Sequence, residues 1–249
     1  MTYEMRYCAF VDILGFTEVI NELRRGGITY EELRATLDVV HRPPLADVDV
    51  FRRSGLKVQS ISDAVCVSAA HNASGLNHML NSLEALTISL LDKGRFVRGA
   101  VVKGKLYHDD KMVFGEAQIR AYNLENNIAR FPRIMLARDV AISALELPRQ
   151  FPNDVIDFVR QSTDGPFFLH VLSAIVPILE SAQDPHDRSN HLARYNLIAS
   201  KIQQRFDDAV DNPRHFEKVQ WFARYWNETT GPFRDEISAV TGPGMNTFD

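Results

Sequence analysis

The sequence predicts an α+β fold, in which a mixed sheet built partly from antiparallel hairpins is flanked by helices and followed by a helical C-terminal extension. Three observations predict this class. Apolar strand patterns fall within about the first 170 residues, and two of them indicate hairpins with short polar turns. Beyond about residue 173 only helical periodicity continues. We therefore expect one domain over residues 1–175 and a helical extension over residues 176–249, packed on that domain.

The strands are predicted where apolar runs rich in β-branched and aromatic residues are bounded by turn residues. The run YCAFVDIL at residues 7–14 is interrupted by a single acid, Asp12. Residues 56–69 break at Ser62-Asp63, which favours two strands joined by a tight hairpin. The remaining strand patterns are a hairpin at residues 97–114 and single strands at residues 133–137 and 167–172.

The helices are predicted where apolar residues recur every three or four positions. They cover residues 17–25, 30–41, 73–92, 116–130, 188–210 and 214–228. We expect Thr17 to cap the first helix, because its hydroxyl can accept a hydrogen bond from an amide of the first turn. An aromatic stripe in the last helix is expected to pack in the core against the main domain. Its members are Trp221, Phe222, Tyr225 and Trp226.

The composition disfavours several classes of protein. The chain has 249 residues with 28 Lys and Arg against 32 Asp and Glu, a net charge of −4, which argues against a general nucleic-acid binder. No apolar run approaches the roughly 18 residues that indicate a membrane span, and the N-terminus lacks a signal-peptide pattern. Cys8 and Cys66 are expected to be buried and reduced. We therefore expect a soluble cytoplasmic protein that binds neither nucleic acid nor membranes.

Asp12 and Asp63 are the most informative pair of residues. Each is an acid at the end of an apolar strand, where a charge is costly unless something compensates it. If the two strands are neighbours, both carboxylates meet at one edge of the sheet, and a divalent cation would relieve their repulsion. Gly15 opens the following helix, whose free amides could hold phosphates. The alternative is that Asp12 caps a turn and Asp63 is an ordinary hairpin residue.

Three segments, in order along the chain, resemble class III nucleotidyl cyclase domains. FVDILGFTE (residues 10–18) resembles their opening strand, and KVQSISDAV (57–65) resembles their second-strand hairpin. Residues 97–125 resemble the next hairpin and the dimer-interface helix. The SISDAV, AYNLE, FPRIML and DGPFF segments, with the aromatic helical tail, more closely resemble the pyrimidine cyclases of bacterial Pycsar anti-phage defence. The resemblance covers essentially the whole chain and implies a cyclase domain over residues 1–175.

The resemblance implies a site with two divalent ions, Mn²⁺ or Mg²⁺, bound by Asp12, Asp63 and the backbone carbonyl of Ile13. It places Gly15 and Phe16 in the turn that binds the triphosphate. The implied reaction is attack of the ribose 3′-hydroxyl of a nucleoside triphosphate on its α-phosphorus, which expels pyrophosphate. A symmetric homodimer with two shared sites is also implied, and its product would signal to a cyclic-nucleotide-sensing effector.

The sequence departs from the purine cyclases at the residues that recognise the base. Gln59 and Met112 stand where purine cyclases have a Lys and an Asp, which disfavours an ordinary adenylyl cyclase. The amide of Gln59 can donate and accept, so it could pair with the edge of uracil or cytosine. Phe51 could narrow the base pocket toward a single ring, although a core aromatic is the other interpretation.

The residues that contact the reacting phosphate also differ from the family. Its late Asn and its transition-state Arg fall on Ile119 and Asn123, and we keep Asn123 as a candidate substrate contact. A substitute cation is then needed at the phosphoryl group. Arg98 is the first candidate, because its strand enters the site, and Arg120 and Arg130 are weaker ones. Surface ion pairs are the alternative for all three arginines.

The sequence thus predicts a uridylate cyclase, a phosphorus–oxygen lyase that converts UTP to 3′,5′-cyclic UMP, with Asp12, Asp63 and Arg98 as its catalytic residues. Cytidylate cyclase is the first alternative, because Gln59 does not discriminate O4 from an exocyclic N4 amine. Two further hypotheses are a non-catalytic nucleotide sensor whose helical tail docks a partner, and a structural dimerisation module. Glu116 and Glu125 are expected to be solvated on their helix.

Overall fold

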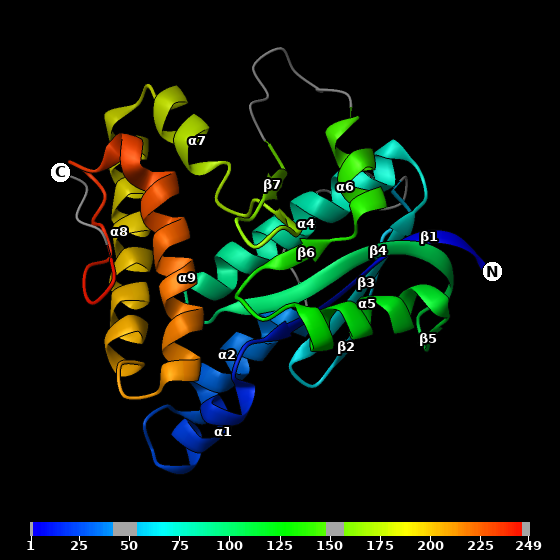
Figure 1. Cartoon of the computed structure of the whole chain (residues 1–249), viewed down its shortest axis with the longest axis horizontal. Helices are drawn as coiled ribbons and strands as arrows, with labels where there is room; N and C mark the ends of the chain where they lie inside the picture. Colours follow the sequence, from blue (N-terminus) through cyan, green and yellow to red (C-terminus); the bar gives the residue numbers. More distant parts are fainter. Residues whose placement is uncertain (1, 42–53, 148–156, 246–249) are drawn as a thin grey trace.

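One mixed sheet with helices on both faces organises the protein (Figure 1). The computed structural model describes residues 2–41, 54–147 and 157–245. The strands run in the order β2-β3-β1-β4-β6-β8-β7, with β5 paired to β4, and only the β4–β6 pair is parallel among those described. Their bounds are β1 Glu4–Ile13, β2 Lys57–Ile61, β3 Ala64–Ala70, β4 Val97–His108, β5 Val113–Phe114, β6 Ile134–Leu136, β7 Val159–Gln161 and β8 Phe167–Leu169.

The helices lie between and after these strands. Their bounds are α1 Phe16–Arg24, α2 Tyr30–His41, α4 Ala73–Leu91, α5 Glu116–Ile128, α6 Arg138–Leu145, α7 Ile175–Ser181, α8 Pro185–Asp208 and α9 Pro213–Thr230. A short 3-10 turn, Gly231–Phe233, follows α9. The predicted α+β class, with a flanked mixed sheet and C-terminal helices, is confirmed.

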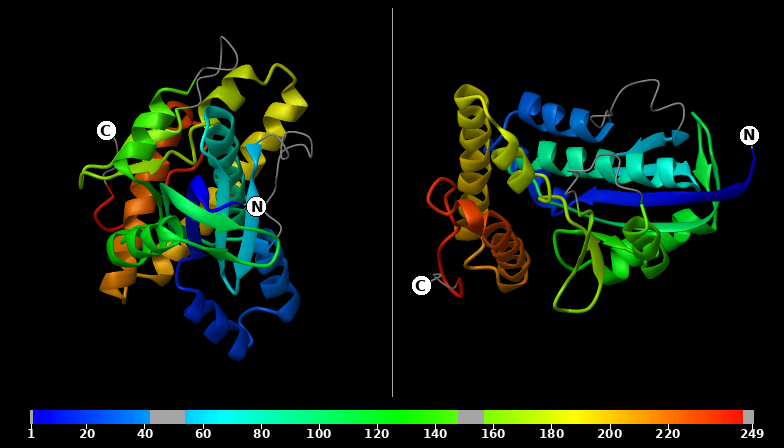
Figure 2. Two further views of the ribbon diagram at one scale, coloured as in Figure 1. Left: turned by 90° about the vertical axis from the view of Figure 1, so that its right-hand side faces the viewer. Right: turned by 90° about the horizontal axis from the view of Figure 1, so that it is seen from above.

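The two faces of the sheet are covered by different helices (Figure 2, right). Side chains alternate between faces along a strand, so Tyr7, Ala9 and Val11 of β1 point to the face covered by α4. Cys8, on the other face, packs with Cys66 against α5. Both thiols are buried and free, as the sequence predicts. Asp12 has the same parity as Cys8, and the side chains of the site therefore lie on the α5 face.

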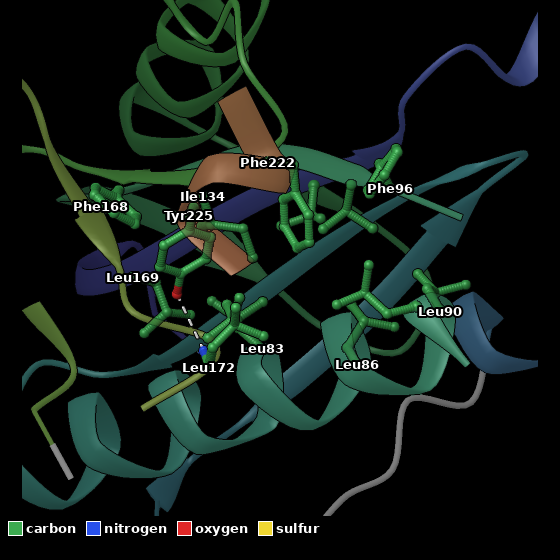
Figure 3. Close-up of a cluster of buried hydrophobic side chains, with 14 of the residues drawn as sticks. Leu83, Leu86, Leu90, Phe96, Ile134, Phe168, Leu169, Leu172, Phe222 and Tyr225 are labelled. Atoms are coloured by element: carbon green, nitrogen blue, oxygen red, sulfur yellow. Dashed lines mark hydrogen bonds between the residues drawn. The ribbon is translucent and has the colours of Figure 1, made fainter. Parts of the chain in front are cut away.

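The C-terminal helices α8 and α9 stand at the end of the sheet where β1 finishes and β4 begins (Figures 1 and 2). Phe222 of α9 contacts Phe96, immediately before β4, with ring centroids 4.9 Å apart. Tyr225 packs edge-on against Phe168, and its hydroxyl accepts a hydrogen bond from the Leu172 amide at 3.1 Å (Figure 3). The prediction that the aromatic stripe of α9 packs in the core is confirmed.

Most predicted elements are confirmed, with ends that shift by a few residues. The strand predicted from residue 7 begins at Glu4, and the prediction of Thr17 as a helix cap is wrong. Gly15, at φ 75°, turns the chain so that α1 begins at Phe16 and Thr17 lies inside its first turn. Three short elements, α6, β7 and α7, were not predicted. The division at residue 175 stays a prediction.

Within the described parts of the chain, no helix is long and apolar enough to cross a membrane.

Candidate functional site

The β2–β3 hairpin turn lies against the end of β1 and brings Asp63 beside Asp12. In the antiparallel β1–β3 pair, Asp12 is opposite Ala64, the residue that follows Asp63. The amide of Ile13 donates a hydrogen bond to the carbonyl of Asp63 at 3.3 Å. Ser62 takes a left-handed conformation, φ 58°, which closes the two-residue turn. The two acids that the sequence singled out therefore occupy neighbouring backbone positions at one edge of the sheet.

Arg98 is the counter-charge of Asp12. It lies directly opposite Asp12 in the antiparallel β1–β4 pair, so both side chains project from the same face. The guanidinium donates from Nε to Oδ1 at 3.2 Å and from Nη2 to Oδ2 at 3.3 Å. This two-bond geometry fixes both oxygens of the carboxylate in one plane with the guanidinium. The first candidate for the substitute cation thus lies at the site.

Glu125 of α5 is a third acid at the site, which the sequence analysis expected to be solvated. That prediction is wrong, because the Glu125 side chain is only 2% exposed, and its Oε1 lies 2.7 Å from the Nε of Arg98. Since that Nε–H already donates to Asp12, the contact with Glu125 is an ion pair without an aligned hydrogen bond. Glu125 continues a buried row of small residues, Ala117 and Ala121, at a spacing of four. That spacing is the signal that could have placed it inward.

The site carries more negative than positive charge. Burial raises the pKa of Asp12, Arg98 opposes this effect, and Asp63 adds to it. Burial, and then the neighbouring Asp12, raises the pKa of Glu125 to about 7, against the effect of Arg98. One guanidinium therefore does not neutralise the carboxylates that face it, and an added cation would stabilise their charged forms.

The donor set of the site fits a hard divalent cation. Carboxylate and backbone carbonyl oxygens are the ligands that Mg²⁺ and Mn²⁺ prefer. In the parts of the chain that are described, no three or more His, Cys, Asp or Glu residues cluster closely enough to hold a metal alone. Asp12 and Asp63 would hold an ion only with carbonyls, water and substrate phosphates completing the shell. Such incomplete protein ligation is usual for Mg²⁺ sites at phosphates.

The turn after β1 places the first amides of α1 next to this carboxylate group. Gly15 precedes α1 without a side-chain cap, and it accepts hydrogen bonds from the Glu18 and Val19 amides. No neighbouring atom lies within 4 Å of the position that a Cβ at Gly15 would take, so the turn is open on that side. Phe16, the first residue of α1, is half-buried. The positive end of the α1 dipole can therefore face an anion.

The residues predicted to contact the base or substrate are Gln59, Asn123 and Phe51. Gln59 lies farther along the α5 face of the sheet. Gln59 pairs in register with Cys66, which lies opposite Phe10, so Gln59 is level with Phe10. Its Nε2 donates to the Lys111 carbonyl at 3.3 Å, while its Oε1 is buried without a hydrogen-bond partner among the described residues. Asn123 is exposed on α5. Phe51 lies outside the described residues.

The weaker arginine candidates have other partners. Arg120 donates to the Lys103 carbonyl at 2.7 Å. Arg130 forms an ion pair with Glu217 of α9. Both are exposed, in keeping with the alternative that they form surface contacts.

Comparison with known proteins finds similarity only among solved structures, since no protein-family model and no curated protein matches the chain. The catalytic core of a rhodopsin-guanylyl cyclase with converted specificity, in complex with ATPαS, matches at TM-score 0.45 and 14% identity, over 67% of this chain and 96% of that one. The monomeric guanylyl cyclase domain of RhoGC from Blastocladiella emersonii matches at 0.42 and 13%, over 67% and 95%. The adenylate/guanylate cyclase/hydrolase from Silicibacter pomeroyi matches at 0.37 and 16%, over 67% and 95%. So few residues are shared that these similarities identify neither a substrate nor site residues.

Proposed function

We propose that the protein is a metal-dependent nucleotidyl cyclase that converts UTP to 3′,5′-cyclic UMP and pyrophosphate. The observation that carries the proposal is the juxtaposition of Asp12, Asp63 and Arg98 at one sheet edge, beside the Gly15 turn. The segments around these residues also resemble those of class III cyclases. In the reaction, O3′ bonds to the α-phosphorus as the bond to the bridging oxygen breaks, and the hydroxyl proton passes to solvent.

Each residue has a separate role in this proposal. Asp12, Asp63 and the carbonyl of Ile13 would hold Mn²⁺ or Mg²⁺, which supplies Lewis acidity at the phosphates when bound. Gly15 and Phe16 orient the triphosphate toward the amides of α1. Arg98 stabilises the charge that develops on the transferred phosphoryl group, and its ion pair with Glu125 helps to hold the guanidinium in place.

The choice of a pyrimidine rests on Gln59. Its Oε1 is buried without a partner in the described chain, which leaves an acceptor on the α5 face of the sheet. An amide can pair with N3–H and O4 of uracil, and after rotation with N3 and N4 of cytosine. Phe51 and Asn123 are proposed as further base or substrate contacts. CTP is therefore the alternative substrate, with cyclic CMP as its product.

The active form is proposed to be a homodimer that shares its sites between subunits. Large apolar side chains are exposed on α5 and the β4–β5 hairpin, a surface that we name the α5 patch. Its members are Met112, Phe114, Ile119, Tyr122 and Ile128, which are 49%, 50%, 62%, 48% and 53% exposed. Contiguous exposed apolar side chains mark protein interfaces. Because the sequence resembles the pyrimidine cyclases of anti-phage defence, the cyclic product is proposed to act as a second messenger to a separate effector in such defence.

The decisive experiment incubates the purified protein separately with ATP, GTP, CTP and UTP and Mn²⁺, and analyses the products by mass spectrometry. Cyclic UMP is expected from UTP, together with pyrophosphate. Asp12→Asn and Asp63→Asn are expected to lower the rate by at least about 10³-fold, because each removes a proposed ligand charge. Cyclic purine nucleotides as the main product would refute the pyrimidine assignment, and the absence of any cyclic product would refute the enzyme.

A non-catalytic nucleotide sensor is the second candidate function, favoured by one observation. Asn123 stands in place of the family arginine, and Arg98 is already held by Asp12 and Glu125. A sensor would still bind nucleoside triphosphate in the Asp12→Ala and Asp63→Ala variants. Neither the wild type nor these variants would show turnover. A structural dimerisation module would show no thermal shift with any nucleoside triphosphate.

A further inference from the structure

Helix α9 packs against the segment that enters β4, and this segment is hydrogen-bonded to the turn that follows β1. His215, Lys218 and Phe222 recur at spacings of three and four, so they share one side of the helix, which we name the α9 stripe. At its C-terminal end, Phe222 packs on Phe96, whose carbonyl accepts a hydrogen bond from the Leu14 amide at 2.9 Å. Phe96 therefore links the stripe to the backbone two residues after Asp12.

The contacts of the residues next to Lys218 define where it lies on the α9 stripe. Glu217, the preceding residue, forms an ion pair with Arg130, which lies after α5. One turn further along, Trp221 stacks on Phe131 with ring centroids 5.6 Å apart. Lys218 is thus held between a contact to the segment after α5 and the Phe222 contact to the start of β4. The first segment follows α5, which carries Glu125, and the second leads into β4, which carries Arg98.

Electrostatic coupling agrees with this placement. Burial, and then the charges of Arg98 and Arg130, lower the pKa of Lys218, whereas Asp12 raises it. Burial, Arg205 and Lys218 likewise lower the pKa of His215, which Glu18 in the first turn of α1 raises. Lys218 and His215 therefore lie within electrostatic range of Asp12 and Glu18, the two acids that flank the Gly15 turn.

Lys218 has no counter-ion of its own in the part of the chain that the structure describes. Among the described residues its ammonium makes no hydrogen bond or ion pair, although the side chain is half-buried. Arg98 and Arg130, the cations near it, are each already held by carboxylates, Asp12 and Glu217. The carboxylates of Asp12 and Glu217 also raise the pKa of Lys218, but each is paired with an arginine. A partly desolvated ammonium without an ion pair is costly unless an anion joins it. A lysine without a counter-ion, close to the N-terminal amides of α1, fits an anionic phosphate group.

We propose that α9 forms one wall of the nucleotide site and that Lys218 binds the β- or γ-phosphate of the triphosphate. The inference rests on the proposed function, since it assigns the triphosphate of that substrate to this wall. It gives the C-terminal extension a direct part in substrate binding. Lys218 is thereby a substrate-binding residue, which contacts the leaving group and not the ribose hydroxyl or the α-phosphorus.

The experiment measures binding of inorganic tripolyphosphate with Mg²⁺, and of UTP with Mg²⁺, by isothermal titration calorimetry. Lys218→Met is expected to weaken both about 10- to 100-fold, because a charge-assisted contact to phosphate is lost. Lys218→Arg is expected to stay within about threefold of the wild type, since it keeps the charge. Lys93→Met is the matched control, because Lys93 is an exposed lysine at the end of α4, and its affinities are expected to be unchanged. In turnover, Lys218→Met is expected to raise KM more than it lowers kcat.

The outcomes separate this inference from the proposed function. Weakened tripolyphosphate binding in Lys218→Met without cyclic product from any wild-type reaction would refute the cyclase and support the phosphate wall. Cyclic product with unchanged tripolyphosphate affinity in Lys218→Met would refute the wall alone. Absence of tripolyphosphate and UTP binding by the wild type would refute both. Because Lys218 makes no hydrogen bond or ion pair with the described residues, Lys218→Met is expected to keep the wild-type melting temperature. If Lys218→Met is less stable, Lys218→Arg still tests the role of the charge in phosphate binding.

Discussion

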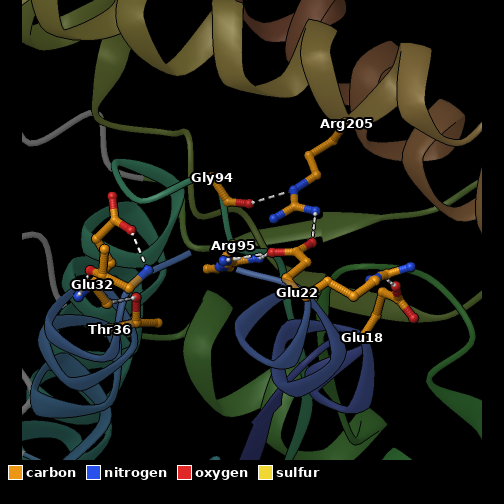
Figure 4. A network of polar contacts seen from close by, with 9 residues as sticks. Glu18, Glu22, Glu32, Thr36, Gly94, Arg95 and Arg205 are labelled. Atoms are coloured by element: carbon orange, nitrogen blue, oxygen red, sulfur yellow. Dashed lines mark hydrogen bonds and ion pairs between the residues drawn. The ribbon is translucent and has the colours of Figure 1, made fainter. Parts of the chain in front are cut away.

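Glu22 of α1 binds Arg205 of α8, and this contact ties the helix that follows the proposed phosphate turn to the C-terminal helices (Figure 4). Glu22 Oε1 accepts from Arg205 Nη1 at 3.0 Å, and Oε2 accepts from both terminal nitrogens of Arg95 at 3.1 Å. Arg205 Nε also donates to the Gly94 carbonyl at 3.1 Å. The Arg95 side chain is 9% exposed and that of Glu22 22%. One carboxylate thus joins α1, the entry to β4 and α8.

Glu22→Gln is expected to lower the free energy of unfolding at pH 7 by about 1–3 kcal/mol, because two partly buried guanidiniums lose their charged acceptor. Burial raises the pKa of Glu22. The combined effect of Arg205 and Arg95 lowers it by more, so the net shift of this pKa is downward. A lowered carboxyl pKa stabilises the fold above the unfolded value, and this stabilisation is lost as pH falls through the folded value. The difference in the free energy of unfolding between the wild type and Glu22→Gln should therefore shrink as pH falls below about 4.5.

The measurement is urea unfolding of both proteins between pH 3.5 and pH 7. Glu18→Gln is the matched control, because Glu18 pairs with Arg25 on the surface of the same helix and both side chains are exposed. Exposed pairs contribute about 0–1 kcal/mol, so its effect should be small. Equal destabilisation by the two substitutions would contradict the role given to Glu22.

Arg98 is expected to stabilise the fold when no divalent ion is bound, because its charge then balances the carboxylates around it. Arg98→Met leaves the carboxylates of Asp12 and Glu125 without their guanidinium, which should lower the free energy of unfolding by about 2–5 kcal/mol in the absence of divalent ions. Mn²⁺ should raise the melting temperature of this variant more than that of the wild type, because the carboxylates then have no competing cation. Activity should fall by about 10²-fold or more.

The control for Arg98 is Arg188→Met. Arg188 pairs with Glu236 at the surface, so its loss should change neither the Mn²⁺ response nor activity. Differential scanning fluorimetry with and without Mn²⁺ gives the comparison. A Mn²⁺ shift in Arg98→Met no larger than in the wild type would show that Asp12 and Asp63 do not bind the ion as proposed.

The sequence is sufficient to predict the Asp12–Asp63 pair because local patterns define it. An apolar strand that ends in an acid, and a two-residue break between two strands, need only that the strands be neighbours. The long elements could be predicted for the same reason. Three elements could not, because α6, β7 and α7 have 8, 3 and 7 residues, too short for periodicity to distinguish them from loops. The strands β6 and β8 are also short, but they lie within longer apolar runs, at residues 133–137 and 167–172.

The remaining features of the site could not be predicted from the sequence, because they depend on contacts between segments that are distant in the chain. Nothing near Lys218 in the chain indicates that α9 lies beside the β1–α1 turn, since that follows from the packing of Phe222 on Phe96. Glu125 was assigned to solvent because a lone acid on a helix usually faces water. Its burial depends on Arg98, a counter-charge contributed by another strand.

Glu84 of α4 is a half-buried carboxyl outside the proposed site, next to the start of α7. Burial raises its pKa to about 7, although the Ser173 hydroxyl and the Ala174 amide donate to it and oppose that shift. A carboxyl whose pKa is higher in the folded state binds its proton more tightly there. Its ionisation therefore costs stability as pH rises from the unfolded value toward pH 7 and above.

Glu84→Gln is consequently expected to raise the free energy of unfolding at pH 8 by about 1–3 kcal/mol, and to have little effect near pH 4. Urea unfolding at both pH values measures this. Glu180→Gln, at an exposed position of α7, is the matched control and should change stability at neither pH. A Glu84→Gln variant that is less stable than the wild type at pH 8 would contradict the sign of the effect.

The α5 patch gives the last prediction. Ile119 is 62% exposed on α5, and a charge there should disrupt an apolar interface between two copies of the chain. Ile119→Asp is expected to weaken the dimer at least tenfold in sedimentation velocity and to lower activity in proportion to the dimer lost. Ile142→Asp is the control, because Ile142 is 48% exposed on α6 and lies outside the patch, so the dimer should persist. Since neither isoleucine is buried in the monomer, both variants should keep the wild-type fold, and an Ile119→Asp protein that dimerises as the wild type does would exclude the α5 patch as the interface.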